Sequence, residues 1–352
     1  MRSPTCKVYK WWRKRQDKTA MVEEQDIVFD MEPFTLTLAN GATLTGLANL
    51  PAVTSTTAKY RPLMVGLHGA SYYSAYFDVD EKHTAALSSN GLGIPFVAVD
   101  RPGYKTSTAF TIPEGSSYPE TYGAWLHEFI LPAVWEKFGV PQGCNGIVLL
   151  AHSLGVSGVV LAAAKSGQEQ GEASVGATPT DAVPPRPKKT SYPLAGIIIS
   201  GLGIHPTDVG SGPLTDNPPE YILFPAHVKD EMYIPKGTCD PAVYAHSERL
   251  NLPVPSREVK DIWTAWLPRI GTEWAPCVRV PVLIALAGKD VYWQSTVEHA
   301  REFAAMFTQS SRAEWCILGG APHNLELSYW SQGWYARCFG FGMECVASLS
   351  AV

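Results

Sequence analysis

Six short apolar runs recur along this chain, and each ends at a glycine or a polar side chain. The runs cover residues 62–67, 94–99, 146–150, 194–199, 280–286 and 315–318. Runs that are apolar at nearly every position, rather than at every second one, are typical of strands buried on both faces of a parallel sheet. The chain is therefore expected to fold around such a sheet.

The segments between most of these runs carry helical patterns, for example 122–138 and 296–307. A stretch rich in β-branched residues, 27–50, precedes them and surrounds Asn40-Gly41, a dipeptide that favours a tight hairpin turn. Strand–helix alternation after a hairpin predicts an α/β fold, with a mostly parallel central sheet flanked by helices. Ligands of such sheets bind beyond the carboxyl ends of the strands.

Two segments interrupt this alternation. Residues 165–192 are rich in Gly, Ser, Thr, Ala and Pro, which predicts a flexible surface insert, most simply a passive loop. Residues 202–277 contain prolines, aromatic residues and at least two helical stretches, of which one opens at Asp240-Pro241 and another at Ser256. This pattern predicts a helical cap over the strand ends. The expected organisation is a basic tail (1–26), an α/β core (27–201 and 278–352) and the cap insertion (202–277).

Composition limits the classes of protein that fit. The 352 residues are 45% hydrophobic and 17% charged, which suits a sizeable core, and the net charge of −5 argues against a nucleic-acid-binding surface. Seven scattered cysteines, odd in number, favour a reduced intracellular protein. No apolar stretch reaches the roughly 20 residues of a membrane span, and none near the N-terminus has signal-peptide length, so a cytoplasmic location is expected.

The expected tail mixes aromatic and positive side chains over residues 9–15, Tyr-Lys-Trp-Trp-Arg-Lys-Arg. Such a segment can contact a membrane surface. A solvated tail, or tryptophans packed on the body of the protein, is the simpler interpretation.

Three residues with complementary chemistry follow three of the apolar runs. Ser153 comes after 146–150, Asp290 after 280–286, and His323 after 315–318. Serine is a poor nucleophile unless a general base takes its proton, and a carboxylate can hold the imidazole of that base in the required tautomer. Because the carboxyl ends of parallel strands share one edge of the sheet, we expect the three side chains to meet there.

The segment Leu149-Leu-Ala-His-Ser-Leu-Gly155 resembles the nucleophile elbow of the α/β-hydrolase superfamily, a strand that turns sharply into a helix of small residues, here 156–164. The turn is strained, so its neighbours must be small, and Ala151 replaces the usual first glycine. Gly155 and Gly158 are expected to let the helix approach the sheet closely. The superfamily order of nucleophile, acid and histidine matches Ser153, Asp290 and His323.

The acid has one competitor. Some members of the superfamily carry it one strand earlier, which would select Asp208 here. Asp290 is favoured because it directly follows an apolar run and a glycine turn.

Acyl transfer also requires hydrogen-bond donors for the developing oxyanion. The N–H of Leu154, after the nucleophile, is one candidate. His68-Gly69-Ala70-Ser71-Tyr72-Tyr73 resembles the superfamily's His-Gly turn, so the N–H of Gly69 or Ala70 is the other, and His68 is expected to brace the loop. The expected substrate-binding residues are Ser71, Tyr72, Trp263, Trp266 and Trp293, and Tyr73 could join them.

Other polar residues near the strand ends are expected to have no catalytic role. Asp100, in Asp100-Arg-Pro-Gly-Tyr104, is expected to bond backbone groups of its own turn. His152 is expected to point away from the catalytic side. No His, Cys or carboxylate cluster has metal-ligand spacing and no glycine-rich phosphate loop follows a strand, so neither a metal nor another cofactor is expected.

Within the superfamily, residues 237–243 and 290–293 resemble capped microbial hydrolases, often fungal, many of which act in secondary metabolism. The resemblance implies a serine hydrolase that cleaves a carboxylic ester, lactone or thioester of a small molecule. The aromatic residues of 202–277 favour an apolar acyl substrate. Non-hydrolytic acyl transfer or cyclisation, and C–C bond cleavage, remain alternatives on the same three residues. A ligand-binding protein without activity is the alternative from another class. The sequence leaves the oligomeric state open.

Overall fold

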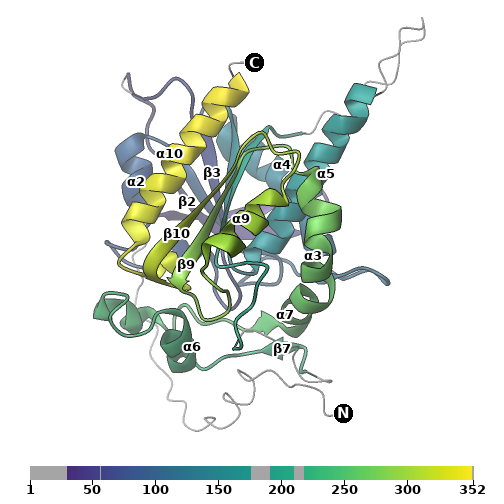
Figure 1. The fold of residues 1–352 in the computed structure, drawn as a ribbon. Coiled ribbons are helices and arrows are strands. Elements are labelled where there is room, and N and C mark those ends of the chain that lie inside the picture. Colours follow the sequence, from purple (N-terminus) through teal and green to yellow (C-terminus); the bar gives the residue numbers. More distant parts are fainter. Residues whose placement is uncertain (1–29, 56, 176–190, 210–217, 351–352) are drawn as a thin grey trace, which may run out of the picture.

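A computed structural model describes residues 30–55, 57–175, 191–209 and 218–350. Its centre is an eight-stranded sheet in the order β1-β2-β4-β3-β5-β6-β9-β10 (Figure 1). The strands are β1 Glu32–Thr37, β2 Thr43–Asn49, β3 Pro62–Leu67, β4 Phe96–Val99, β5 Gly146–His152, β6 Leu194–Ser200, β9 Val282–Lys289 and β10 Ala313–Pro322. All pairs from β4 to β10 are parallel, whereas β2 runs antiparallel to both β1 and β4. The predicted fold class is therefore confirmed.

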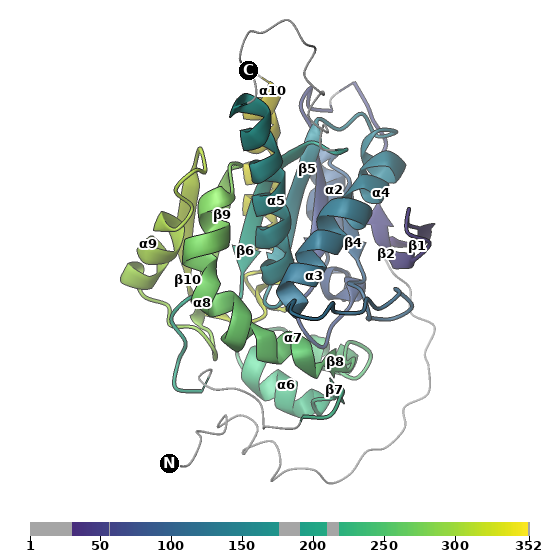
Figure 2. The same ribbon diagram turned by 90° about the vertical axis from the view of Figure 1, so that its right-hand side faces the viewer.

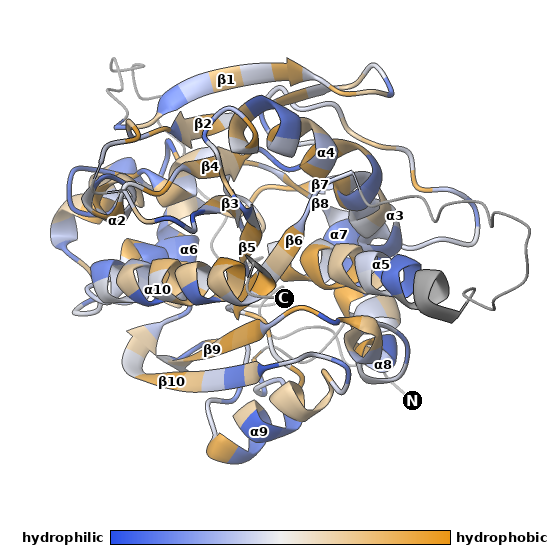
Figure 3. Ribbon diagram, turned by 90° about the horizontal axis from the view of Figure 1, so that it is seen from above, coloured by the Kyte–Doolittle hydropathy of each residue, from blue (hydrophilic) through white to orange (hydrophobic). Residues whose placement is uncertain are grey.

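Helices cover both faces of the sheet (Figure 2). One face carries α3 Tyr118–Trp125, α4 Leu131–Val134, α5 Gly155–Val175 and α9 Val297–Ala305, and the other carries α2 Ala86–Leu92 and α10 Ser331–Ser350. Two 3₁₀ turns, η1 Ser74–Phe77 and η8 Leu325–Leu327, add to the second face. The central strands β3, β4, β5 and β6 are buried at every position, as their continuous apolar runs predict. Figure 3, which is coloured by hydropathy, shows the mostly hydrophobic character of β6 and of its neighbour β9.

The opening hairpin forms where Asn40-Gly41 predicts it. Strands β1 and β2 pair from Glu32↔Ala48 to Thr37↔Thr43. The turn between them places Gly41 at φ +81°, and the Asn40 side chain accepts a hydrogen bond from the N–H of Ala42. A positive φ is a conformation that glycine adopts without steric cost.

The helical pattern over 122–138 is confirmed, but the helix begins earlier. Helix α3 starts at Tyr118 because Ser117 and Glu120 form a capping box, in which each side chain bonds the other residue's backbone N–H. The helical path then continues to Gly139 through wider turns, η2 Leu126–Ile130 and η3 Trp135–Gly139, on either side of α4.

Helix α5 is longer than its sequence suggests. It runs to Val175, so it enters the segment for which composition predicts a flexible insert. This part of the helix packs closely at Gly167, whose carbonyl accepts a hydrogen bond from Arg279 and where an added Cβ would lie 2.1 Å from the carbonyl oxygen of Cys277. The remaining proline-rich part, 176–190, and the basic tail lie outside the described residues.

The segment 202–277 is here called the inserted segment. Its residues 218–261 lie at the carboxyl edge of the sheet, below it in Figures 1 and 2, and its residues 262–277 run up beside α5 along one face of the sheet. Its elements are β7 Tyr221–Ile222, α6 Ala226–Tyr233, η4 Pro241–His246, β8 Val254–Pro255, α7 Ser256–Asp261, η5 Ile262–Trp266, α8 Leu267–Arg269, η6 Ile270–Trp274 and η7 Ala275–Cys277. Asp240 caps η4 as predicted, by accepting from the N–H of Ala242, and α7 begins at Ser256.

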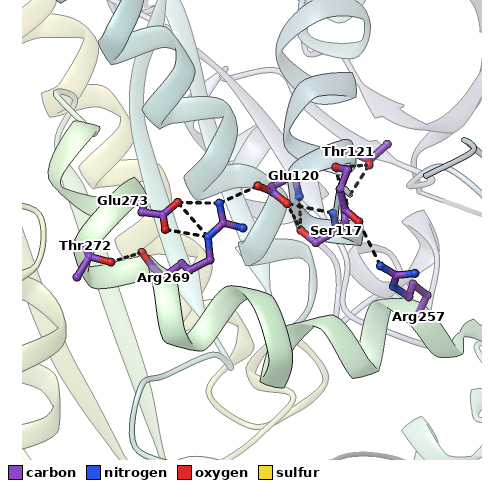
Figure 4. Close-up of polar contacts among 8 residues, drawn as sticks. Ser117, Glu120, Thr121, Arg257, Arg269, Thr272 and Glu273 are labelled. Atoms are coloured by element: carbon purple, nitrogen blue, oxygen red, sulfur yellow. Dashed lines mark hydrogen bonds and ion pairs between the residues drawn. The ribbon is translucent and has the colours of Figure 1, made fainter. Parts of the chain in front are cut away.

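Polar contacts fasten the inserted segment to the start of α3 (Figure 4). Arg269 bonds both Glu273 and Glu120, the carboxylate of the capping box. Arg257 donates to the carbonyl of Ser116, and Asp261 accepts from the N–H of Tyr118 at 2.8 Å. The segment is thus held at the first turn of a core helix by several charge-assisted bonds.

Two further expectations from the sequence concern membrane spans and the state of the cysteines. Within the described residues, no helix is long and apolar enough to cross a membrane. The cysteines in this part of the chain, Cys144, Cys239, Cys277, Cys316, Cys338 and Cys345, are all free.

One of the two glycines at the start of α5 has the predicted role, and the other does not. A Cβ at Gly155 would lie 2.7 Å from the carbonyl oxygens of Leu67 and His68, so Gly155 does allow contact with the sheet. Gly158 instead faces α3, where an added Cβ would lie 2.1 Å from the Tyr122 ring.

We therefore expect Gly158→Ala to lower the free energy of unfolding by about 1–3 kcal/mol, because the close contact between α3 and α5 must open. Gly340→Ala is the matched control: this glycine lies within α10 and an added Cβ meets nothing within 4 Å. It should stabilise the protein by about 0.5–1 kcal/mol, since alanine favours helices. Urea unfolding of both variants measures the difference, and equal effects would contradict the packing argument.

Candidate active site

Ser153 lies at the sharp turn between β5 and α5. Its backbone has φ +50°, a left-handed conformation that is strained for any residue except glycine. The turn fits because its neighbours are small: an added Cβ at Gly69 would lie 2.9 Å from the Cβ of Ser153. The N–H of Ser153 donates to the carbonyl of Ser200, which fixes the turn to β6.

The structure brings Ser153, His323 and Asp290 together in one hydrogen-bonded chain. His323 Nε2 lies 3.2 Å from Ser153 Oγ, and His323 Nδ1 lies 2.9 Å from Asp290 Oδ2. An ionised carboxylate only accepts hydrogen bonds, so Nδ1 carries the proton and Nε2 is left as the acceptor for the serine hydroxyl. This arrangement suits removal of the Ser153 proton by His323.

Asp290 is held by the turn that follows β9. Its Oδ1 accepts from the N–H groups of Tyr292, at 2.8 Å, and Trp293, at 3.3 Å, which leaves Oδ2 for His323. The side chains of Asp290 and His323 are each only 2% exposed. The competing acid, Asp208, is exposed to solvent after β6.

Aromatic rings surround the imidazole of His323. The rings of His152, Tyr233 and Tyr292 have their centroids 5.0, 5.2 and 5.3 Å from that of His323. Tyr233, from α6 of the inserted segment, and Tyr292, from the turn that holds Asp290, join their hydroxyl groups at 2.7 Å. Neither tyrosine was among the predicted site residues, because partners from distant segments leave no mark in the local sequence.

The expectation that His152 points away from the site is wrong. Its ring lies against His323, stacks on Tyr76, and bonds Ser200 Oγ and Asn324 Oδ1, each at 3.1 Å. Burial lowers its pKa well below the usual value, so His152 is a neutral packing partner of His323.

A buried carboxyl group, Glu326, lies behind this pair of histidines. It accepts from Tyr76 Oη at 2.6 Å and from Trp334 Nε1 at 2.9 Å, and His152 Nδ1 is 3.7 Å away. Burial raises the pKa of Glu326, with its hydrogen bonds acting in the opposite direction. In sequence it resembles an ordinary charge on a short helix.

The loop after β3 packs against Ser153, as the His-Gly pattern predicts. His68 Nε2 accepts from the backbone N–H of Arg101 at 3.1 Å, so His68 Nδ1 carries the proton and donates to the carbonyl of Gly69 at 2.8 Å. His68 therefore braces the loop, and burial lowers its pKa. Among the described residues, the N–H groups of Ala70 and Leu154 meet no hydrogen-bond acceptor.

The predicted substrate-binding residues of this loop are buried supports. Ser71, with φ +63°, offers its carbonyl to Lys229 Nζ at 2.9 Å and to the N–H of Leu252 at 3.0 Å. Tyr72 is 3% exposed and accepts from Asn324 Nδ2 at 2.8 Å. The adjacent Tyr73 is also buried.

The three predicted tryptophans separate into two groups. Trp263 is half-buried and stacks on the buried ring of Trp293, with ring centroids 5.7 Å apart, beside the turn that carries Asp290. Trp266 is fully buried in the hydrophobic core on the side of the sheet that carries α3 and α5. A side chain without exposed surface cannot meet a ligand unless the core opens, so Trp266 is placed as a packing residue.

Asp100 also differs from its expected partners. Its carboxylate accepts from the N–H of Ser74 and from Thr45 Oγ1, so it joins η1 to β2 rather than closing its own turn. Within the described parts of the chain, no group of three or more His, Cys, Asp or Glu side chains is arranged to hold a metal ion.

Comparison with known proteins identifies a family and a shared fold. A family model described as the alpha/beta hydrolase family matches residues 64–332. A monoacylglycerol lipase from Paleococcus ferrophilus is 16% identical, with a TM-score of 0.52 over 82% of this chain and 97% of its own. E-2-(acetamidomethylene)succinate hydrolase is 15% identical, with a TM-score of 0.52 over 89% and 99%. At these identities the two structures show a shared fold only, and no curated protein matches the chain in sequence.

Lys229 provides a test of the buried contacts around the loop. It is 2% exposed, and burial lowers its pKa to about 7, although Asp230 and Glu248 act in the opposite direction. The unfolded chain keeps this proton up to about pH 10.4, so the unfolded state binds more protons between these values and the free energy of unfolding should rise with pH there. The rise is up to about 1.4 kcal/mol per pH unit.

Lys229→Met should remove this rise, because methionine does not titrate. The measurement is urea unfolding of both proteins from pH 6 to pH 10, with the exposed Lys236→Met as the control. Parallel pH profiles for the wild type and Lys229→Met would show that Lys229 stays protonated in the folded protein.

Proposed function

The chain belongs to the alpha/beta hydrolase family, and we propose that it is a serine hydrolase that cleaves a carboxylic ester, lactone or thioester without a cofactor. The observation that carries the proposal is the chain of hydrogen bonds from Ser153 through His323 to Asp290, at 3.2 and 2.9 Å. Each member follows a different parallel strand, and each follows it at the same edge of the sheet.

The proposed reaction has two half-reactions. Ser153 Oγ attacks the substrate carbonyl while His323 Nε2 takes the hydroxyl proton, and the imidazolium is stabilised by Asp290. Collapse of the tetrahedral adduct breaks the bond to the leaving alcohol or thiol, which receives the proton from His323. Water, deprotonated by His323, then attacks the acyl-enzyme, and the acid product leaves with Ser153 restored.

Two backbone N–H groups are the proposed oxyanion donors. Leu154 follows the nucleophile, and Ala70 lies on the loop that packs against it; both N–H groups lack an acceptor among the described residues. We favour the N–H of Ala70 over that of Gly69. His68 and Arg101 hold the Gly69 carbonyl, and the N–H of Ala70 belongs to the same peptide group and points the opposite way from that carbonyl. Donors that are fixed before the reaction stabilise the developing charge without reorganisation.

The inserted segment is proposed to cap the site and to shape its acyl pocket. Tyr233 of this segment packs against His323, and Trp263 stacks on Trp293 beside the Asp290 turn. These aromatic surfaces favour an apolar acyl group, and the paired hydroxyls of Tyr233 and Tyr292 offer one polar contact near the base.

The direct test is covalent labelling by a fluorophosphonate probe. Ser153→Ala should abolish labelling and leave the fold intact, because alanine is no larger than serine at the strained turn. Ser166→Ala, a buried serine farther along α5, is the matched control and should be labelled like the wild type. Labelling that survives Ser153→Ala would refute the assigned nucleophile.

A second test separates the two candidate acids. Asp290→Asn should lower kcat for p-nitrophenyl butyrate by about 10⁴-fold, because the amide imposes the wrong tautomer on His323. Asp208→Asn, at an exposed position, should change kcat by less than about threefold. The reverse result would place the acid after β6.

A further inference from the structure

We propose that the buried ion pair of Arg101 and Glu258 is a positioning device, which orients the Ala70 N–H toward the oxyanion through the Gly69 carbonyl. The proposal rests on the proposed serine hydrolase function. It adds two residues that touch neither substrate nor nucleophile, one from the turn after β4 and one from α7 of the inserted segment.

The argument begins with the geometry of one peptide group. The carbonyl of Gly69 and the N–H of Ala70 belong to the same planar unit and point in opposite directions when the bond is trans. The Gly69 carbonyl accepts from Arg101 Nη2 at 3.1 Å and from His68 Nδ1 at 2.8 Å. Holding the carbonyl on that side turns the Ala70 N–H to the other side, where it meets no acceptor among the described residues.

Arg101 influences this peptide group both directly and through His68. Its guanidinium bonds the Gly69 carbonyl directly, and its backbone N–H bonds His68 Nε2, which makes His68 Nδ1 the second donor. A cationic donor also polarises the peptide group, so the opposite N–H becomes a stronger donor. Both effects favour the form of the loop that stabilises an oxyanion.

The inserted segment supplies the partner that Arg101 requires. Glu258 is fully buried, pairs with Arg101 Nη1, and accepts from Tyr104 Oη at 2.7 Å. The guanidinium also lies over the rings of Tyr104 and Tyr122, at 4.7 and 5.4 Å. A buried cation without its carboxylate is strongly destabilised, so the position of Arg101 depends on the docked inserted segment.

A purely structural ion pair would not need the bond to Gly69. Glu258 and Tyr104 already provide the arginine with an anion and a ring, yet a third contact is directed at the peptide beside Ser153. The other side of the loop has the same design, since Lys229 of the inserted segment bonds the Ser71 carbonyl. Two buried basic side chains therefore hold the carbonyls on either side of Ala70.

The experiment compares Arg101→Lys with the double variant Arg101→Met/Glu258→Leu. Lysine keeps the charge near Glu258 but lacks the fork that reaches both Glu258 and Gly69. The double variant removes both charges, and apolar replacement of a buried pair is often tolerated by the fold, so it keeps the proposal testable if the lysine variant does not fold. Near-ultraviolet circular dichroism reports whether each variant is folded.

We expect kcat for p-nitrophenyl butyrate to fall about 10- to 100-fold in both variants, with KM within about threefold of wild type, because misorienting one oxyanion donor weakens the transition state alone. Affinity for an alkyl trifluoromethyl ketone, which forms a tetrahedral oxyanion on serine, should fall by a similar factor. Affinity for butyrate, which forms no such adduct, should not change.

The control is Arg61→Gln, which removes another buried arginine, bonded to Gln142 at the amino end of β3. It should lower stability and leave kcat and the ketone affinity unchanged. Folded Arg101 variants that keep wild-type kcat and ketone affinity, or that lose affinity for ketone and butyrate equally, would overturn the proposal. Absence of fluorophosphonate labelling in the wild type would instead refute the proposed function.

Discussion

The left-handed backbone of Ser153 is the constraint on which the rest of the site depends. A non-glycine residue at φ +50° persists only when the surrounding structure enforces it. Here β5 leads into the turn, Gly155 lets α5 start against the β3 carbonyls, and Gly69 lets the neighbouring loop approach Ser153. The same close packing that strains the candidate nucleophile also brings the loop of Gly69 and Ala70 against Ser153.

Much of the fold follows from local sequence because strand burial is a local property. The apolar runs locate the parallel strands, and Asn40-Gly41 locates the hairpin, since one turn conformation suits that dipeptide. Helix ends were harder to predict. Glycine and serine in α5 favour a loop by composition, but the helix continues to Val175, with Gly167 in close contact with the Cys277 carbonyl. Such a contact joins positions far apart in sequence, so no local pattern records it.

The candidate site also contains residues that the local sequence predicts and residues that it does not. Chain order and strand ends were sufficient to select Ser153, Asp290 and His323, which the structure brings into one hydrogen-bonded chain. The residues around them could not be selected, because Glu258 and Lys229 resemble ordinary surface charges on amphipathic helices, yet both are buried. Trp266 shows the opposite error: aromatic content suggested a ligand contact, whereas its ring fills the core.

The buried side chains of Glu258 and Lys229 couple the inserted segment to the loop beside Ser153. Burying a guanidinium is costly unless it is paired, and the partners of Arg101 come from both the segment (Glu258) and the core (the Gly69 carbonyl). Displacing the segment would remove Glu258 from Arg101, and Lys229 from the Ser71 carbonyl, in one movement. Docking of the segment and the geometry of the Gly69–Ser71 loop therefore belong to one cooperative unit. A segment coupled in this way contributes to the proposed oxyanion site as well as to the proposed acyl pocket, so the core without it would hold the candidate nucleophile beside an unconstrained loop.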